Sequence, residues 1–171
     1  MSSKKRDLLK DVIQHIDITK INSTDIIDSM RDMSFSSRDT ARAADILQMM
    51  IRDKDCTNWL TMAGSSSAGG CMQVYVDMVR FNMIDCIVST GASIIDMDFF
   101  EALGFKHYKG TPFVDDGMLR SVYIDRIYDT YIDEEELQHC DATIKKIADS
   151  LEPRPYSSRE FLWETGKWLK E

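Results

Sequence analysis

Two short apolar runs, separated by a glycine- and serine-rich segment and a helix-like stretch, constrain the fold of this chain most. The runs are TNWLTMA at residues 57–63 and MIDCIVST at residues 83–90, and residues 71–82 between them carry apolar side chains at helical spacing. The second run is almost continuous in apolar and β-branched residues, which is typical of a strand buried on both faces. The order strand, loop, helix, strand predicts a right-handed crossover between neighbouring parallel strands. The sequence therefore predicts an α/β fold.

Size and charge exclude several classes of protein. The 171 residues are 43% hydrophobic, which is enough to bury a core, so we expect a single domain over residues 1–171. A net charge of -8 argues against a nucleic-acid or anionic-membrane binder, which would present a basic face. No apolar run approaches the roughly 18 residues of a membrane helix, and the N-terminus does not resemble a signal peptide. We expect a cytoplasmic protein that binds neither nucleic acid nor membrane.

The cysteines and histidines show no metal-ligand spacing. No C-x-x-C pair occurs, and each cysteine lies in an apolar-periodic segment, which favours reduced core thiols over disulfides. The cysteines are Cys56, Cys71, Cys86 and Cys140. The three histidines are scattered, so no metal is assigned.

Helical periodicity predicts further helices outside the crossover. They are expected at residues 40–53, 93–103, 133–151 and 157–171. Gly104 is expected to end the second of them, and residues 106–118 are expected to form a loop. The last two begin with a capping-box pattern, in which an N-cap side chain and a glutamate three residues later satisfy free backbone N–H groups. The two pairs are Asp133 with Glu136, and Ser157 with Glu160.

The loop GSSSA at residues 64–68 joins the first predicted strand to the helix. Backbone N–H groups at a helix N-terminus are unpaired and the helix dipole is positive there, so such a loop can bind a pyrophosphate without a basic side chain. A structural interpretation remains open beside this one, in which the serines cap the helix while Gly69 and Gly70 allow tight packing. The P-loop and G-x-G-x-x-G motifs are both absent, so neither ATP or GTP chemistry nor a standard dinucleotide fingerprint is expected.

The second predicted strand also ends in a small-residue turn, STGAS at residues 89–93. Open parallel sheets bind ligands at the carboxyl ends of neighbouring strands, so we expect this turn and residues 64–68 to line one crevice. Asp96 and Asp98 follow the turn and are candidates to receive a ribose hydroxyl or a cationic amine. The alternative is that they are helix N-terminal carboxylates favoured by the dipole.

Long stretches of the sequence resemble the deoxyhypusine synthase family, and most of all its archaeal and bacterial deoxyhypusine-synthase-like branch. The stretches are IVSTGASIIDMDFFEALGFKHYKG, VDDGMLR, IDRIYDTYIDEEEL, SLEPRPYSSREFLWETGKWL and DMSFSSRDTARAADILQMMIRDKDCTNWLTMAGS. The resemblance implies a Rossmann-like α/β domain with a parallel sheet and flanking helices, NAD as cofactor, and homotetramers with active sites at dimer interfaces. Members of the family oxidise spermidine and transfer its aminobutyl group to a lysine of the hypusine-bearing translation factor or, in related enzymes, to putrescine.

The resemblance also implies roles for the two turns. The dinucleotide would contact Gly64, Ser65, Ser66, Ser67 and Ala68 of the first turn and Thr90, Gly91 and Ala92 of the second. An acidic pair after the second turn would help to bind the polyamine, and Asp96 is its nearest match. The Glu-Glu pair of eukaryotic members is replaced here by IIDMD with a one-residue shift, so Asp98 stays an alternative.

The resemblance covers the N-terminal half of the family's chain, so the expected fold is incomplete at the C-terminus. The second half of the family carries a GGG stretch, further NAD contacts and the imine-forming lysine, and nothing here matches it. Lys167 and Lys170 align with an ordinary helix, and a Schiff-base lysine needs a desolvated pocket. We therefore expect no catalytic residue in this chain and no aminobutyl transfer by these residues alone, with Lys106 and Lys109 the least implausible substitutes.

Three interpretations of function remain open from the sequence. The first is the N-terminal portion of an NAD-dependent aminobutyltransferase. The second is a non-catalytic NAD-binding or regulatory paralogue that pairs with a full-length subunit, and the third is a small α/β anion-binding module. The last predicted helix carries three large apolar side chains, Phe161, Trp163 and Trp168. Their presence suggests that this helix packs against a further segment.

Overall fold

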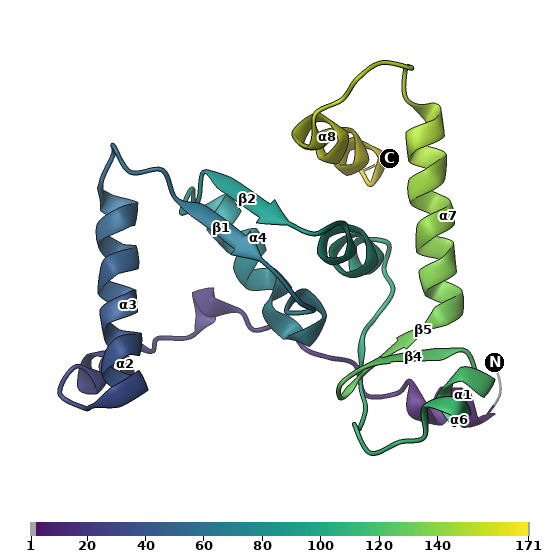
Figure 1. Ribbon diagram of the computed structural model, residues 1–171, viewed down its shortest axis with the longest axis horizontal. Helices are drawn as coiled ribbons and strands as arrows, with labels where there is room; N and C mark the ends of the chain where they lie inside the picture. Colours follow the sequence, from purple (N-terminus) through teal and green to yellow (C-terminus); the bar gives the residue numbers. More distant parts are fainter. Residues whose placement is uncertain (1–2, 171) are drawn as a thin grey trace. The chain divides into compact units, whose positions relative to one another are not determined.

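The computed structural model describes residues 3–170, which divide into two compact units (Figure 1). The β1–β2 unit contains residues 15–62 and 71–89. The α7 unit contains residues 3–14, 63–70 and 90–170.

The β1–β2 unit is built around two parallel strands. β1 (Trp59–Met62) pairs with β2 (Cys86–Ser89) in parallel, so this part of the predicted topology is confirmed. The helices of the unit are α2 (Thr24–Met30), α3 (Phe35–Arg52) and α4 (Met72–Arg80), with a 3₁₀ turn at Ile18–Lys20. α4 is the predicted crossover helix.

The α7 unit contains a three-stranded antiparallel sheet that the sequence analysis missed. Its strands are β3 (Tyr108–Lys109), β5 (Thr130–Asp133) and β4 (Ile124–Ile127), in that spatial order. The β4–β5 turn consists of Tyr128 and Asp129, and Tyr128 has φ 53. Two-residue hairpin turns need residues with positive φ, which are usually the pair Asn-Gly or Asp-Gly. A tyrosine in this turn therefore gives no sequence signal for a hairpin.

The remaining helices of the α7 unit include the three predicted at residues 93–103, 133–151 and 157–171, together with two short helices that were not predicted. They are α1 (Ser3–Leu8), a π-helical segment (Ala92–Phe99), α5 (Phe100–Ala102), α6 (Asp116–Ser121), α7 (Glu134–Ser150) and α8 (Ser158–Trp168). The expected loop at residues 106–118 is wrong in part, because it contains β3 and the start of α6.

None of the helices within residues 3–170 is long and apolar enough to cross a membrane.

The helix ends show which capping signals the sequence carries. The Ser157–Glu160 capping box is present, with each side chain accepting the other residue's backbone N–H. The expected box at α7 is wrong: Asp133 accepts the Glu135 N–H at 2.9 Å, and Glu136 does not reach back to the cap. Gly104 ends its helix as predicted, with φ 98 and an N–H bond to the Glu101 carbonyl oxygen.

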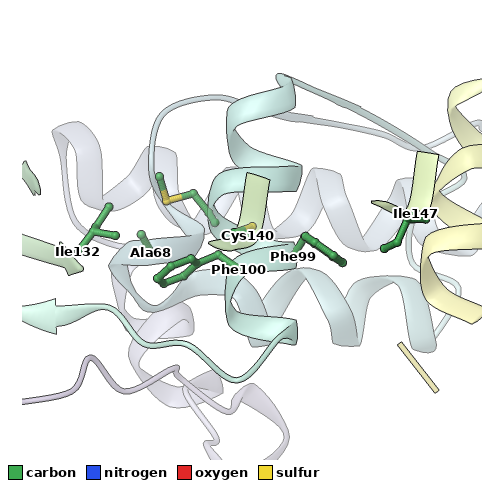
Figure 2. Close-up of a cluster of buried hydrophobic side chains, with 7 residues drawn as sticks. Ala68, Phe99, Phe100, Ile132, Cys140 and Ile147 are labelled. Carbon is green, nitrogen blue, oxygen red and sulfur yellow. The ribbon is translucent and has the colours of Figure 1, made fainter. Parts of the chain in front are cut away.

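The core of the α7 unit packs the segment after β2 onto α7. Figure 2 shows Phe99 and Phe100 beside the α7 side chains Cys140 and Ile147. The buried members of this cluster are Ala68, Met97, Phe99, Phe100, Ile132, Cys140 and Ile147. Because Ala68 belongs to the glycine-serine loop, the loop is anchored in this core at one end.

Gly110 lies against the ring of Tyr131 on β5, where a larger residue has no room. A Cβ at this position would come within 2.4 Å of the buried ring. We predict that Gly110→Ala lowers the free energy of unfolding by about 1–3 kcal/mol through overpacking, measured by urea denaturation. Gly166→Ala on α8, where a Cβ meets no atom within 4 Å, is the matched control and should stabilise. An unchanged midpoint for Gly110→Ala would contradict the predicted overpacking.

Candidate functional site

The two small-residue turns are hydrogen-bonded to each other. The first turn, residues 64–68, follows β1, and the second turn, residues 89–93, begins at the last residue of β2. The Ser93 hydroxyl donates to the Gly64 carbonyl oxygen at 3.1 Å, and Thr90 Oγ1 accepts the Ser93 N–H at 3.3 Å. The structure therefore brings together the two turns that the sequence singled out, each directly after one of two paired parallel strands.

Glycines in both turns border open space. A Cβ on Gly64, Gly69 or Gly91 would meet no atom within 4 Å. Gly64 has φ 71, a left-handed conformation that favours glycine, whereas Gly91 has φ -56 and tolerates any residue. A ligand can therefore approach the backbone closely at these positions.

Ser67 is buried with an unused hydroxyl. Its side chain is 1% exposed, and Oγ has no hydrogen-bond partner within residues 3–170. Buried polar groups are nearly always hydrogen-bonded, so an unsatisfied hydroxyl beside two open glycines fits a ligand that offers acceptors. Ala68 points instead into the core cluster, which makes it a residue that positions the turn (Figure 2).

The helical segment after the first turn is interrupted. A single π-helical turn at Ser67–Cys71 is broken by Gly70 at φ 105, and α4 begins only at Met72. A Cβ at Gly70 would lie 2.9 Å from the Gln14 carbonyl oxygen, so this glycine serves the tight packing that one interpretation foresaw. Gly69 borders open space and has no such role. The α4 dipole therefore does not begin directly at residues 64–68, and the serine hydroxyls and the glycine backbone that borders open space are the better candidates for ligand contacts.

Asp96 and Asp98 lie two residues apart on the Ala92–Phe99 segment, so they point in different directions. Burial raises the pKa of the Asp96 carboxyl, and the nearby charge of Asp141 raises it further. Both effects disfavour the ionised form of Asp96, and a bound cation would offset them. One carboxylate oxygen of Asp98 is buried. Asp96 and Asp98 therefore both stay candidates for binding an amine.

The lysines of the described chain do not have the environment of an imine-forming nucleophile. Lys106 and Lys109 are exposed, and desolvation is what lowers a lysine pKa. Lys5 is buried, which sequence reasoning missed, but it is ion-paired with Asp133 and Glu135. Burial lowers the pKa of Lys5, yet the hydrogen bonds to those two carboxylates outweigh it and the net shift is upward.

A separate polar hollow of about 650 Å³ lies among α6, β4 and α7 and contains none of the predicted site residues. Its arginine Arg126 is already held by Asp116 at 2.8 and 3.0 Å. Burial raises the pKa of Asp125 to about 6, with a hydrogen bond to Glu134 adding to the shift.

Within residues 3–170, no group of three or more His, Cys, Asp or Glu side chains could hold a metal ion.

Comparison with known proteins decides the family. Residues 25–171 match the family model described as "Deoxyhypusine synthase". The chain belongs to the deoxyhypusine synthase family. This confirms the resemblance seen in the sequence, and the structure supports it at the level of a mixed α/β fold with a small parallel sheet.

Members of the deoxyhypusine synthase family match nearly the whole chain. A "Deoxyhypusine synthase-like protein" of Caulobacter vibrioides is 66% identical over 170 residues, covering 99% of this chain and 46% of the relative. One of Coxiella burnetii is 60% identical over 171 residues, covering 100% of this chain and 49% of the relative. A "Probable deoxyhypusine synthase 2" of Methanosarcina mazei is 35% identical over 154 residues, covering 90% and 44%. The chain spans about half the length of the curated relatives it matches.

Proposed function

We propose that this chain supplies part of the NAD site of a deoxyhypusine-synthase-like aminobutyltransferase. The enzyme would oxidise spermidine and pass its aminobutyl group to an amine, either a protein lysine or putrescine. The observation that carries the proposal is the hydrogen bond from Ser93 to the Gly64 carbonyl oxygen, which joins two open small-residue turns after two parallel strands. A cytoplasmic homo-oligomer, a homotetramer by family resemblance, is part of the same proposal.

NAD would be held by the residues of the two turns. They are Gly64, Ser65, Ser66, Ser67, Ala68, Thr90, Gly91 and Ala92. When bound, NAD supplies the hydride acceptor for amine oxidation. The glycine positions would let it approach the backbone, and the buried Ser67 hydroxyl would donate to one of its acceptor oxygens. The Ala68 side chain would hold the first turn on the core.

Asp96 would bind a cationic amine of the polyamine. Its carboxylate is partly desolvated and lies near the charge of Asp141, so an ammonium ion would stabilise the ionised form. Asp98 is the alternative ligand. An acidic chain with a net charge of -8 also attracts polycations over longer distances.

A second candidate function is a non-catalytic paralogue that binds NAD or regulates a full-length subunit. One observation favours it: Lys106 and Lys109 are exposed, so neither has the desolvated pocket of an imine-forming lysine. Both candidates require the same NAD-binding turns. They differ in whether a complex containing this chain turns over spermidine.

Gly91→Val is expected to weaken NAD binding by about tenfold or more, measured by calorimetric titration. Valine adopts the backbone conformation of Gly91 without strain, and its side chain would fill the space through which the cofactor approaches. Gly166→Val, an equally open glycine on α8, is the matched control and should leave the affinity unchanged. Equal NAD affinity in the Gly91→Val and parent chains, both folded by circular dichroism, would count against the proposed site.

A further inference from the structure

The polar hollow among α6, β4 and α7 holds more negative than positive charge. Five charged side chains line it, the acids Asp116, Asp125 and Glu134 and the bases Arg120 and Arg126. When all five are ionised, three carboxylates face two guanidinium groups, so the hollow lacks one positive charge. Its volume of about 650 Å³ is that of a pocket for a small organic molecule.

Arg126 is occupied by partners of its own. Its guanidinium group donates to the two Asp116 carboxylate oxygens at 2.8 and 3.0 Å, and to the Tyr128 carbonyl oxygen at 2.8 Å. Arg120 is exposed and forms no ion pair within residues 3–170. Neither arginine therefore compensates the other two carboxyl groups of the hollow.

Those two carboxyl groups, on Asp125 of β4 and Glu134 of α7, share a proton. They are hydrogen-bonded to each other, and an ionised carboxylate can only accept, so one of them is protonated in this contact. Partial burial, followed by the contact with Glu134, raises the pKa of Asp125 to about 6. The same contact and a hydrogen bond from Gln138 lower the pKa of Glu134. The charge of Lys5 lowers it further, although Lys5 is ion-paired elsewhere. Near neutral pH the proton is lost and the two carboxylates repel, unless a cation takes its place.

The lining of the hollow favours an organic ammonium ion over a metal ion. Within residues 3–170, no group of three or more carboxylate, thiol or imidazole side chains could hold a metal ion. An ammonium group instead offers several N–H donors to carboxylate oxygens at once. Leu119 and Ile124 also line the hollow, and the side chain of Tyr123 is 59% exposed there. These side chains provide an apolar contact for a short carbon chain.

We propose that the polar hollow binds a small organic ammonium ion, with its nitrogen at the Asp125–Glu134 pair and its carbon chain against Leu119, Ile124 and Tyr123. The bound cation replaces the shared proton and supplies the missing positive charge. The hollow contains none of the residues of the proposed NAD and polyamine site, so the proposal does not rest on that site.

The test is an NMR titration of the ¹⁵N-labelled chain with butylammonium chloride at pH 7, with 1-butanol as the uncharged probe of equal length. We expect butylammonium, and not 1-butanol, to shift the amides of residues 119–126 and 134–138, with saturation in the millimolar range. At pH 5 the apparent dissociation constant should be about tenfold higher, because below a pKa of about 6 the proton competes for the pair.

Asp125→Asn removes one carboxylate at nearly unchanged size and leaves the hollow with balanced charge. It should weaken butylammonium binding by about tenfold or more and abolish the dependence on pH. Asp149→Asn is the matched control, because Asp149 is an exposed acid of α7 outside the hollow, and it should leave the binding unchanged. Glu134→Gln replaces Asp125→Asn if circular dichroism shows that the asparagine variant does not fold.

Three results would overturn the proposal. The first is the absence of saturable shifts at residues 119–126 and 134–138, including the case in which butylammonium shifts only residues 93–98 around Asp96. The second is an equal response to 1-butanol, which would show that charge plays no part. The third is binding that survives Asp125→Asn at the affinity of the parent chain. Because NAD is absent throughout, none of these results bears on the proposed NAD site.

Discussion

Replacement of Lys5 by methionine is expected to lower the free energy of unfolding by about 3–5 kcal/mol. Lys5 Nζ lies 2.6 Å from Asp133 Oδ1 and 2.7 Å from Glu135 Oε2, and the Lys5 and Asp133 side chains are 4% and 6% exposed. Methionine has a similar length and no charge, so the buried Asp133 carboxylate would lose its cation. The pair also fixes α1 to the junction of β5 and α7, so its loss should release the N-terminal helix.

The matched control for this prediction is Lys145→Met. Lys145 pairs with Asp149 on the surface of α7, where both side chains are mostly exposed. Exposed ion pairs contribute about 0–1 kcal/mol, so this variant should stay close to the parent chain in urea denaturation. Equal midpoints for the two variants would contradict a stabilising role for the buried pair.

The second large effect concerns the transfer reaction. With NAD, spermidine and putrescine, the chain alone is expected to release no 1,3-diaminopropane above background. Covalent transfer through an imine needs a lysine with a lowered pKa, whereas Lys106 and Lys109 are exposed and the pKa of Lys5 is raised. Release at an enzymatic rate by the chain alone would show that one of its own lysines forms the imine.

Addition of the unmatched half of the Caulobacter relative should restore release if the chain supplies the NAD-binding turns. In that complex, Asp96→Asn is expected to lower kcat/KM for spermidine by about 10- to 100-fold, the loss of one hydrogen bond between charged groups. Asp98→Asn is the paired comparison. A larger effect of Asp98→Asn would identify Asp98 as the residue that binds the amine. No effect of either substitution would show that neither residue belongs to the polyamine site. A complex that forms and binds NAD without turnover would favour the non-catalytic paralogue.

Local sequence signals predicted the parallel strand pair and one helix cap. The run at residues 83–90 forms the predicted strand, but the expectation that it is buried on both faces is wrong, because Ile87 and Val88 are 40% and 48% exposed. A helix between two such runs leaves few topologies. Ser157 and Glu160 are three residues apart and satisfy each other's backbone groups, so this cap needs no tertiary information. The family resemblance then identified the two turns as one candidate site.

Features that depend on distant partners could not be predicted in this way. Lys5 and Asp133 are 128 positions apart, and nothing local distinguishes Lys5 from the solvated lysine beside it. The β4–β5 hairpin lacks a glycine or asparagine at Tyr128, although its φ is positive. The break at Gly70 is likewise set by the approach of the Gln14 carbonyl oxygen, a contact between distant segments.

The most direct test of the proposed function is an NMR titration of the ¹⁵N-labelled chain with NAD, because amide shifts locate even weak binding. We predict that the largest shift changes fall on residues 64–69 and 90–92, with the Gly64 and Gly91 amides among them, and that Gly91→Val reduces these changes at every NAD concentration. Saturating NAD that leaves both turns unchanged, while amides elsewhere such as those of the polar hollow at Asp125 and Arg126 shift, would contradict it.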